Sequence, residues 1–248
     1  MTADFSVATL WQIGRRSRNE DRYGEVVSRD GTRRAWAVAD GVGGHPGGDL
    51  AAEAAVAGAL AHVERAESGE TIGATVRHGL EAAQEAVARA RSSGGRNAGM
   101  ATTIVLAVSD GRTVAWGHVG DSRIYRIRDG SVERLTRDHS VAEAMRALSG
   151  ASDADEALPV HGDVLLSSLG ADEPAYTIGD VEELRRDDVF LLCTDGLWAH
   201  VSARTLAAEL QAAVSLQDWL DRLGRHVQSA DDPRQDNFTA IAFRATSS

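Results

Sequence analysis

Short apolar runs rich in β-branched residues recur along the chain, and they constrain its fold more than any other feature. Asp-Gly pairs separate several of them, at Asp30-Gly31, Asp110-Gly111 and Asp129-Gly130, and this dipeptide supplies the positive φ angles of tight hairpin turns. The pattern therefore predicts antiparallel hairpins. We expect strands at about 5 to 11, 34 to 39, 102 to 109, 113 to 119, 122 to 128, 131 to 135, 188 to 193 and 238 to 244.

Stretches with helical periodicity come in two pairs between the strands. The first pair covers about 48 to 66 and 71 to 92, and the second about 203 to 213 and 216 to 229. Ser202 is expected to cap the third helix, and Ser215 with Asp218 resembles a capping box for the fourth. Strands, two helices, many strands and two more helices predict an α+β layered architecture, with antiparallel sheets and helices packed outside them.

The organisation of the chain favours one domain over residues 1–248, because no proline-rich or serine-rich linker and no repeat divides it. Residues from about 137 to 175 fit the layered pattern least well. They are polar and irregular apart from a short helical stretch near 140 to 148. We expect this segment to be a mobile flap or insertion.

Composition excludes several classes of function. All 26 basic residues are arginine, so no lysine Schiff base, lysine general base or P-loop lysine is available. They face 37 acidic residues, and the net charge of −11 opposes nucleic-acid binding. Cys193, the single cysteine, lies in an apolar run and is expected to be a buried thiol. Without a signal-peptide pattern or an apolar run of ~20 residues, we expect a cytoplasmic protein with no membrane partner.

Three aspartates stand at the ends of expected strands. Asp40 ends one apolar run, Asp195 follows another, and Asp236 immediately precedes the last strand. A carboxylate at the end of a buried strand is costly unless it is paired or binds a metal. If these strand ends meet, their hard oxygens suit Mg²⁺ or Mn²⁺. Spacing alone leaves turn-capping roles equally open, and Asp121 is a further carboxylate at a strand end.

Two loops could bind phosphate. The mixed cluster Arg15–Arg22 is either a salt-bridged surface loop or a phosphate clamp, since guanidinium groups match phosphate oxygens. The glycine-rich segment 41–48 fails the nucleotide-loop register because Pro46 occupies a glycine position, but its small residues allow close approach to a metal or phosphate. His45 within it is either an acid/base group or a loop-stabilising residue. The other histidines considered show no ligand spacing: His118, His139, His161 and His200.

Six motifs, taken in order, resemble those of the metal-dependent Ser/Thr protein phosphatases of the protein phosphatase 2C type, in the bacterial single-domain form. Each motif alone is weak, but six in family order from residue 14 to residue 240 are a specific signal. They are Arg16-x-x-Asn19-Glu20-Asp21, Ala39-Asp40-Gly41-Val42-Gly43-Gly44-His45, Gly99-Met100-Ala101-Thr102-Thr103, Gly120-Asp121-Ser122-Arg123, Cys193-Thr194-Asp195-Gly196-Leu197-Trp198 and Asp236-Asn237-Phe238-Thr239.

The resemblance implies a four-layer α-β-β-α sandwich, two antiparallel sheets flanked by helix pairs, with a two-metal centre at one end. By motif position, Asp40 would bridge two Mn²⁺ or Mg²⁺ ions, and the Gly41 carbonyl would bind one of them. Asp195 and Asp236 would ligate the other ion.

The same resemblance implies roles for four more residues. Glu20 and Asp21 would act through metal-bound waters, and Arg16 would hold the substrate phosphate. Asp121, with Asp195, would hold a third and weaker metal ion. The implied reaction is hydrolysis of phosphoserine or phosphothreonine in proteins by metal-activated water. It needs no nucleophilic side chain, in agreement with the absence of a Gly-x-Ser-x-Gly elbow.

The implied partners are phosphorylated proteins, with a bacterial Ser/Thr kinase as the opposing activity and the phosphatase acting as a monomer. Two alternatives stay open: a catalytically silent, partner-binding domain of the same fold, and a phosphomonoesterase for small molecules. Three departures from the family pattern matter. Val42 stands where many relatives have a histidine proposed as leaving-group acid, so His45 or a metal-bound water remains for that role. The flap segments 161–163 and 167–170 differ from the family pattern. The lead segment 9–14 differs from it as well, so Arg15 and Arg18 remain candidates for the phosphate clamp beside Arg16.

Overall fold

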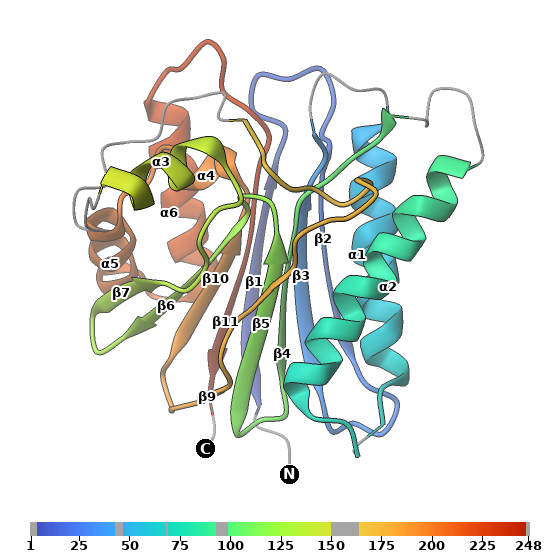
Figure 1. Cartoon of the computed structure of the whole chain (residues 1–248). Coiled ribbons are helices and arrows are strands. Elements are labelled where there is room, and N and C mark those ends of the chain that lie inside the picture. Colours follow the sequence, from blue (N-terminus) through green and yellow to red (C-terminus); the bar gives the residue numbers. More distant parts are fainter. Residues whose placement is uncertain (1–3, 43–46, 68, 93–98, 150–163, 247–248) are drawn as a thin grey trace.

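Two antiparallel sheets pack face to face, and helices cover both outer faces (Figure 1). The structure is a computed structural model, and it describes residues 4–42, 47–67, 69–92, 99–149 and 164–246. One sheet has the strand order β1-β11-β10-β6-β7, and the other has β2-β3-β4-β5-β8 with β9 also paired to β5. The predicted four-layer α-β-β-α sandwich is therefore confirmed.

The first sheet consists of β1 (Phe5–Gln12), β6 (Arg123–Arg128), β7 (Ser131–Arg134), β10 (Val189–Cys193) and β11 (Phe238–Ala245). The second consists of β2 (Asp21–Val27), β3 (Arg34–Asp40), β4 (Ile104–Ser109), β5 (Thr113–Val119), β8 (Thr177–Ile178) and β9 (Glu182–Glu183). Helices α1 (Gly48–Arg65) and α2 (Ile72–Ser92) cover the second sheet, whereas α4 (Asp195–Trp198), α5 (Ala203–Ala212) and α6 (Leu216–Ser229) cover the first. Helix α3 (Val141–Ser149) belongs to the connection between β7 and β8.

Three apolar cores separate the four layers. One joins α1 and α2 to the second sheet, one joins α4, α5 and α6 to the first, and one lies between the sheets. In the middle core Trp36 of β3 stacks on Phe243 of β11 with ring centroids 3.8 Å apart, and Phe190 of β10 stacks on the same Phe243 with centroids 4.9 Å apart. These rings hold the two sheets in one relative position, which the site at their common end requires.

The structure bears out the expected strands to within about two residues, and the three Asp-Gly pairs form the hairpin turns. Both helix pairs form as expected, and Ser202 and Ser215 accept hydrogen bonds from the backbone amides of Thr205 and Asp218. Strand β2 was not predicted, because DRYGEVV carries charged residues on the exposed face of an edge strand and does not form an apolar run. Strands β8 and β9 and helix α4, each of four residues or fewer, were not predicted either.

The expected flap, residues 137 to 175, is described only in part, because its middle, residues 150–163, lies outside the described residues. The described portion contains α3 and takes part in three isolated bridges, Ser140 to Leu165, Thr102 to Leu169 and Leu169 to Ala171. The second bridge ties this connection to the start of β4, beside the site. Within the described ranges, no helix is both long and apolar enough to cross a membrane.

Candidate active site

Strand pairing brings Asp195 and Asp236 together. Strands β10 and β11 are antiparallel, with Cys193 opposite Ala240, so the end of one strand and the start of the other lie at the same sheet edge. Asp195 follows the end of β10, and Asp236 precedes the start of β11. Their closeness is a consequence of register, which joins residues 41 positions apart in the sequence.

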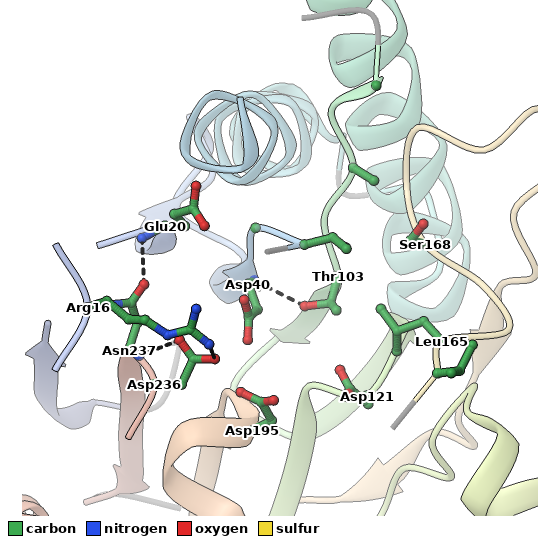
Figure 2. A pocket seen from close by; sticks show the side chains of 15 residues that line it. Arg16, Glu20, Asp40, Thr103, Asp121, Leu165, Ser168, Asp195, Asp236 and Asn237 are labelled. Carbon is green, nitrogen blue, oxygen red and sulfur yellow. Dashed lines mark hydrogen bonds and ion pairs between the residues drawn. The ribbon is translucent and has the colours of Figure 1, made fainter. Parts of the chain in front are cut away.

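The second sheet places Asp40 at the same end of the molecule. Asp40 is the last residue of β3, and its register partner in β2 is Asp21. Asp121 lies in the turn between β5 of one sheet and β6 of the other. Figure 2 shows the carboxylates of Asp40, Asp121, Asp195 and Asp236 around one central space, with Arg16 at its side.

These residues line a cavity of about 730 Å³. Its lining contains five carboxylates, and Arg16 is the one cationic side chain among the described lining residues. Flap residues Val164, Leu165 and Ser168 form part of the wall. The full lining is Arg16, Glu20, Asp40, Gly41, Val42, Gly99, Ala101, Thr103, Asp121, Val164, Leu165, Ser168, Asp195, Asp236 and Asn237.

The backbone of Asp40 is held by hydrogen bonds with two threonines. The Asp40 amide donates to Thr103 Oγ1 at 3.0 Å, and its carbonyl accepts from Thr102 Oγ1 at 2.7 Å and from the Thr103 amide at 2.8 Å. Thr103 Oγ1 is in turn 2.7 Å from Ser122 Oγ, beside Asp121. These bonds direct the Asp40 carboxylate into the cavity. Burial, followed by the charges of Asp21 and the other acids, raises the pKa of Asp40 well above its usual range.

Asn237 joins the loop that carries Arg16 to the start of β11. Its Oδ1 accepts from the Glu20 amide at 2.8 Å, and its Nδ2 donates to the carbonyls of Ile13 and Arg18 at 2.8 and 3.0 Å. No role was predicted for Asn237 from the sequence, although it follows Asp236 in the last family motif. No roles were predicted for Thr103 and Trp198 either. These residues act through tertiary hydrogen bonds to the backbone of Asp40 and Asp121, which motif spacing does not reveal.

Asp21 lies behind the cavity and not on its wall. Its side chain is fully buried, Oδ2 accepts from Thr194 Oγ1 at 2.9 Å, and Oδ1 has no hydrogen-bond partner among the described residues. Burial raises the pKa of Asp21 to about 7, and the charges of Asp195 and Asp236 add to that effect. The structure thus separates Asp21 from Glu20, which lines the cavity directly.

The structure distinguishes the three arginines that the sequence left as clamp candidates. Arg16 lines the cavity and donates from Nη2 to Asp236 Oδ2 at 2.6 Å (Figure 2). Arg15 pairs with Asp231 on the surface, and Arg18 lies 3.7 Å from Asp49. Arg16 alone of the three therefore points a guanidinium group into the described cavity.

The backbone of Asp121 contacts a buried cluster of side chains beside the first sheet. The Trp198 indole donates to the Asp121 carbonyl at 2.9 Å, and the Arg123 guanidinium stacks 3.5 Å above the Trp198 ring. Arg123 also makes a bidentate pair with buried Asp138, at 2.6 Å for the shortest bond. Burial, with the charges of Asp195 and Asp138, raises the pKa of Asp121 well above its usual range.

None of the histidines that the structure describes lines the cavity. His118 is buried, its Nε2 lies 2.8 Å from the Arg137 carbonyl, and burial lowers its pKa to about 4. His139 Nδ1 accepts from the Gly120 amide at 3.2 Å and thereby supports the turn before Asp121. His45 and His161 lie outside the described residues. Cys193 is buried, as predicted.

The residues present fit a divalent metal centre of the hard type. Among the described residues around the cavity the donors are carboxylate and backbone oxygens, with neither cysteine nor histidine. Burial, and then repulsion between neighbouring carboxylates, raises the pKa values of Asp40 and Asp121, and a bound cation would offset both effects. Gly41 packs so closely on Gly48 that a Cβ at Gly41 would lie 2.4 Å from the Gly48 carbonyl, so its backbone can line the site only as glycine.

A family model described as protein phosphatase 2C matches residues 12–236, a range that contains every residue placed at this cavity except Asn237. The chain belongs to the protein phosphatase 2C family. It is 33% identical over 181 residues to the serine/threonine protein phosphatase PstP of Mycobacterium tuberculosis, a match that covers 72% of this chain but only 34% of PstP. It is 31% identical over 210 residues to the serine/threonine phosphatase stp of Listeria welshimeri, covering 83% and 82% of the two chains.

Solved structures of family members share the whole fold. The crystal structure of the M. tuberculosis PstP phosphatase matches with a TM-score of 0.85 at 27% identity, covering 98% of this chain and 99% of that one. The catalytic domain of PstP in complex with two manganese ions matches with a TM-score of 0.80, also at 27% identity. A family member of this fold thus holds two manganese ions, in agreement with the hard donor set found here.

Proposed function

We propose that this chain is a metal-dependent protein serine/threonine phosphatase and that residues 1–248 form one catalytic domain. The observation that carries the proposal is the convergence of Asp40, Asp121, Asp195 and Asp236 from two sheets on one cavity that also receives Arg16. Carboxylates gathered without enough neighbouring cations bind divalent metals, and a guanidinium group beside them binds phosphate. Family membership supports the same reaction class.

We assign the metal ligands residue by residue. Asp40 and the Gly41 carbonyl would hold one ion, Asp40 would bridge to a second held by Asp195 and Asp236, and Asp121 with Asp195 would hold a third, weaker one. Glu20, on the cavity wall, and Asp21, behind it, would act through bound waters. When bound, Mn²⁺ or Mg²⁺ ions supply the Lewis acidity that activates water for attack on phosphorus.

The chain's own residues position the phosphate and keep the carboxylates in place. Arg16 would donate to phosphate oxygens, and its present partner, Asp236, is the carboxylate that we assign as a metal ligand. Thr103 and Thr102 fix the Asp40 backbone, and Asn237 fixes the loop that carries Arg16. Val42 and Leu165 contribute apolar side chains to the wall of the cavity.

The substrates that we propose are phosphoserine and phosphothreonine in proteins. The matched relatives are named serine/threonine phosphatases, and the cavity is open enough at 730 Å³ to receive a phosphorylated side chain. We further propose that the enzyme acts in the cytoplasm as a monomer, opposes a Ser/Thr kinase and tolerates either Mn²⁺ or Mg²⁺. The flap residues Leu165 and Ser168, on the cavity wall, would contact the peptide around the phosphorylated residue.

The test compares hydrolysis of a phosphothreonine peptide with that of a chromogenic aryl phosphate, in Mn²⁺, in Mg²⁺ and in EDTA. We expect metal-dependent turnover that favours the peptide and is abolished in Asp40→Asn and Asp236→Asn, with unchanged circular dichroism. Asp231→Asn is the matched control for Asp236→Asn, because Asp231 lies in the same loop and pairs with Arg15 on the surface.

The outcomes separate the alternatives. Turnover retained in either site variant contradicts the assignment of these ligands. Metal binding without turnover of either substrate identifies a catalytically silent partner-binding domain, and preference for the aryl phosphate identifies a small-molecule phosphomonoesterase.

A further inference from the structure

A second group of potential metal ligands lies where α1 joins α2, away from the cavity. His62 comes from the last turn of α1, Glu70 from the connection, and His78 from α2. One ligand atom of each residue lies within 4.8 Å of those of the other two. Helix α1 begins beside the cavity at Gly48, so about 20 Å of helix separates the two places, at a rise of about 1.5 Å per residue.

The three side chains already face one another. His78 Nδ1 lies 2.5 Å from Glu70 Oε1, and His62 Nε2 lies 3.9 Å from Glu70 Oε2. The two imidazole rings meet edge to face with centroids 5.7 Å apart. Ligand atoms on one tetrahedral ion are roughly 3.3 Å apart, given metal–ligand bonds of about 2.0 Å. Side-chain rotations that move these ligand atoms by about an ångström would therefore bring all three within bonding distance of one ion.

His62 contributes an observation that an ordinary hydrogen-bonded cluster does not explain. Its Nε2 is buried and has no hydrogen-bond partner among the described residues, although it points toward Glu70. Buried polar atoms are almost always satisfied, so an unsatisfied one calls for a missing partner. Burial also lowers the pKa of His62, which favours the neutral imidazole that binds metals.

Glu70 is held in place for this role by a second contact. Thr75 Oγ1, in the first turn of α2, donates to Glu70 Oε2 at 3.1 Å. A ligating carboxylate that is itself hydrogen-bonded keeps its orientation, as is usual in metal sites. The cluster is also accessible, since the His78 side chain is 48% exposed and those of His62 and Glu70 are 28% and 21% exposed.

We propose that His62, Glu70 and His78 form a binding site for one Zn²⁺ ion that is separate from the carboxylate cavity. Two imidazoles and one carboxylate suit borderline metals such as Zn²⁺, whereas the oxygen-only cavity suits Mn²⁺ and Mg²⁺. Three protein ligands leave a fourth position for water. The ion links the end of α1 to the start of α2, and so fastens the helix pair that covers the second sheet. This site does not depend on the proposed phosphatase activity.

The experiment measures zinc binding by the full chain, stripped with EDTA, freed of any affinity tag and held in excess Mg²⁺ to occupy the carboxylate cavity. We expect one Zn²⁺ per chain by calorimetry, and a visible absorption band when Co²⁺ replaces it. Zinc at 100 times its Kd should raise Tm by about 5 to 10 °C. An Asp40→Asn, Asp236→Asn background repeats the titration with the cavity disabled.

Site variants decide the assignment. His62→Gln and His78→Gln should each lose the zinc equivalent, the Co²⁺ band and the Tm increase, while circular dichroism stays unchanged. His226→Gln is the matched control, because His226 is an exposed histidine on α6 that should leave all three readouts intact. Absence of binding in the wild type, or equal binding in all variants, overturns the proposal. Failure of the phosphatase assay would not affect it.

Discussion

The burial of Asp21 predicts that the metal-free protein loses stability as pH rises. Its carboxyl is fully buried, Oδ1 has no hydrogen-bond partner in the part of the chain that the structure describes, and burial raises its pKa from 3.8 to about 7. A group whose pKa is raised on folding stabilises the fold fully below the unfolded pKa, and this contribution is lost as pH rises through the folded pKa. The window is therefore about pH 4 to 7.

The magnitude follows from the shift of about three pH units, each equivalent to about 1.4 kcal/mol. Ionised Asp21 costs the fold about 4 kcal/mol in all, of which about 3 kcal/mol appears between pH 5 and pH 8. Asp21→Asn removes the ionisation and keeps an oxygen that can accept from Thr194. We expect the variant to be more stable than the wild type at pH 8 in EDTA, and nearly equal to it at pH 4.

Urea unfolding followed by circular dichroism, in EDTA at pH 4, 5 and 8, measures this difference. Asp30→Asn is the contrasting control: hydrogen bonds from Ser28 and Thr32 lower the pKa of exposed Asp30 to about 2, so its removal should weaken the fold at neutral pH. Addition of Mn²⁺ at pH 8 should stabilise the wild type more than Asp21→Asn, because the ions offset the buried charge. If Asp21→Asn shows the same loss of stability between pH 5 and pH 8 as the wild type, the reasoning is refuted.

Three further predictions concern the site and the core. Arg16→Ala should raise KM for a phosphopeptide and lower kcat, whereas Arg18→Ala should alter neither by more than about twofold; steady-state kinetics decide between them. Phe243→Ala removes the ring stacked between the sheets and should cost about 3 to 5 kcal/mol, a fall in Tm of about 10 °C by calorimetry. Gly196→Ala would place a Cβ 2.0 Å from the Asn237 carbonyl oxygen, and this clash should lower the free energy of unfolding by about 1 to 3 kcal/mol. The clash should also displace Asp236, the residue before Asn237, and so lower turnover measured at saturating Mn²⁺.

Much of the fold was predictable from local sequence pattern. Apolar runs and Asp-Gly turns act over a few residues, and they predicted most strands and the three hairpins. Helical periodicity and serine caps are equally local, and they predicted the two helix pairs. Edge strand β2 did not, because half of its residues face solvent and carry polar groups, and pairing with β3 is what makes it a strand. The order of strands and helices predicted a layered α+β architecture, and the family motifs added its division into two sheets between helix pairs.

The sequence alone determined which residue types could do chemistry: the absence of lysine removed lysine-based mechanisms, and the aspartates at strand ends offered oxygen ligands for a metal. Tertiary structure decided which of them meet. Register placed Asp195 beside Asp236, sheet packing brought Asp40 to them, and ion pairs on the surface left Arg16 as the arginine at the cavity. Burial and proximity also set the pKa values of Asp21 and Asp40, because desolvation and charge repulsion depend on distances that exist only once the chain is folded.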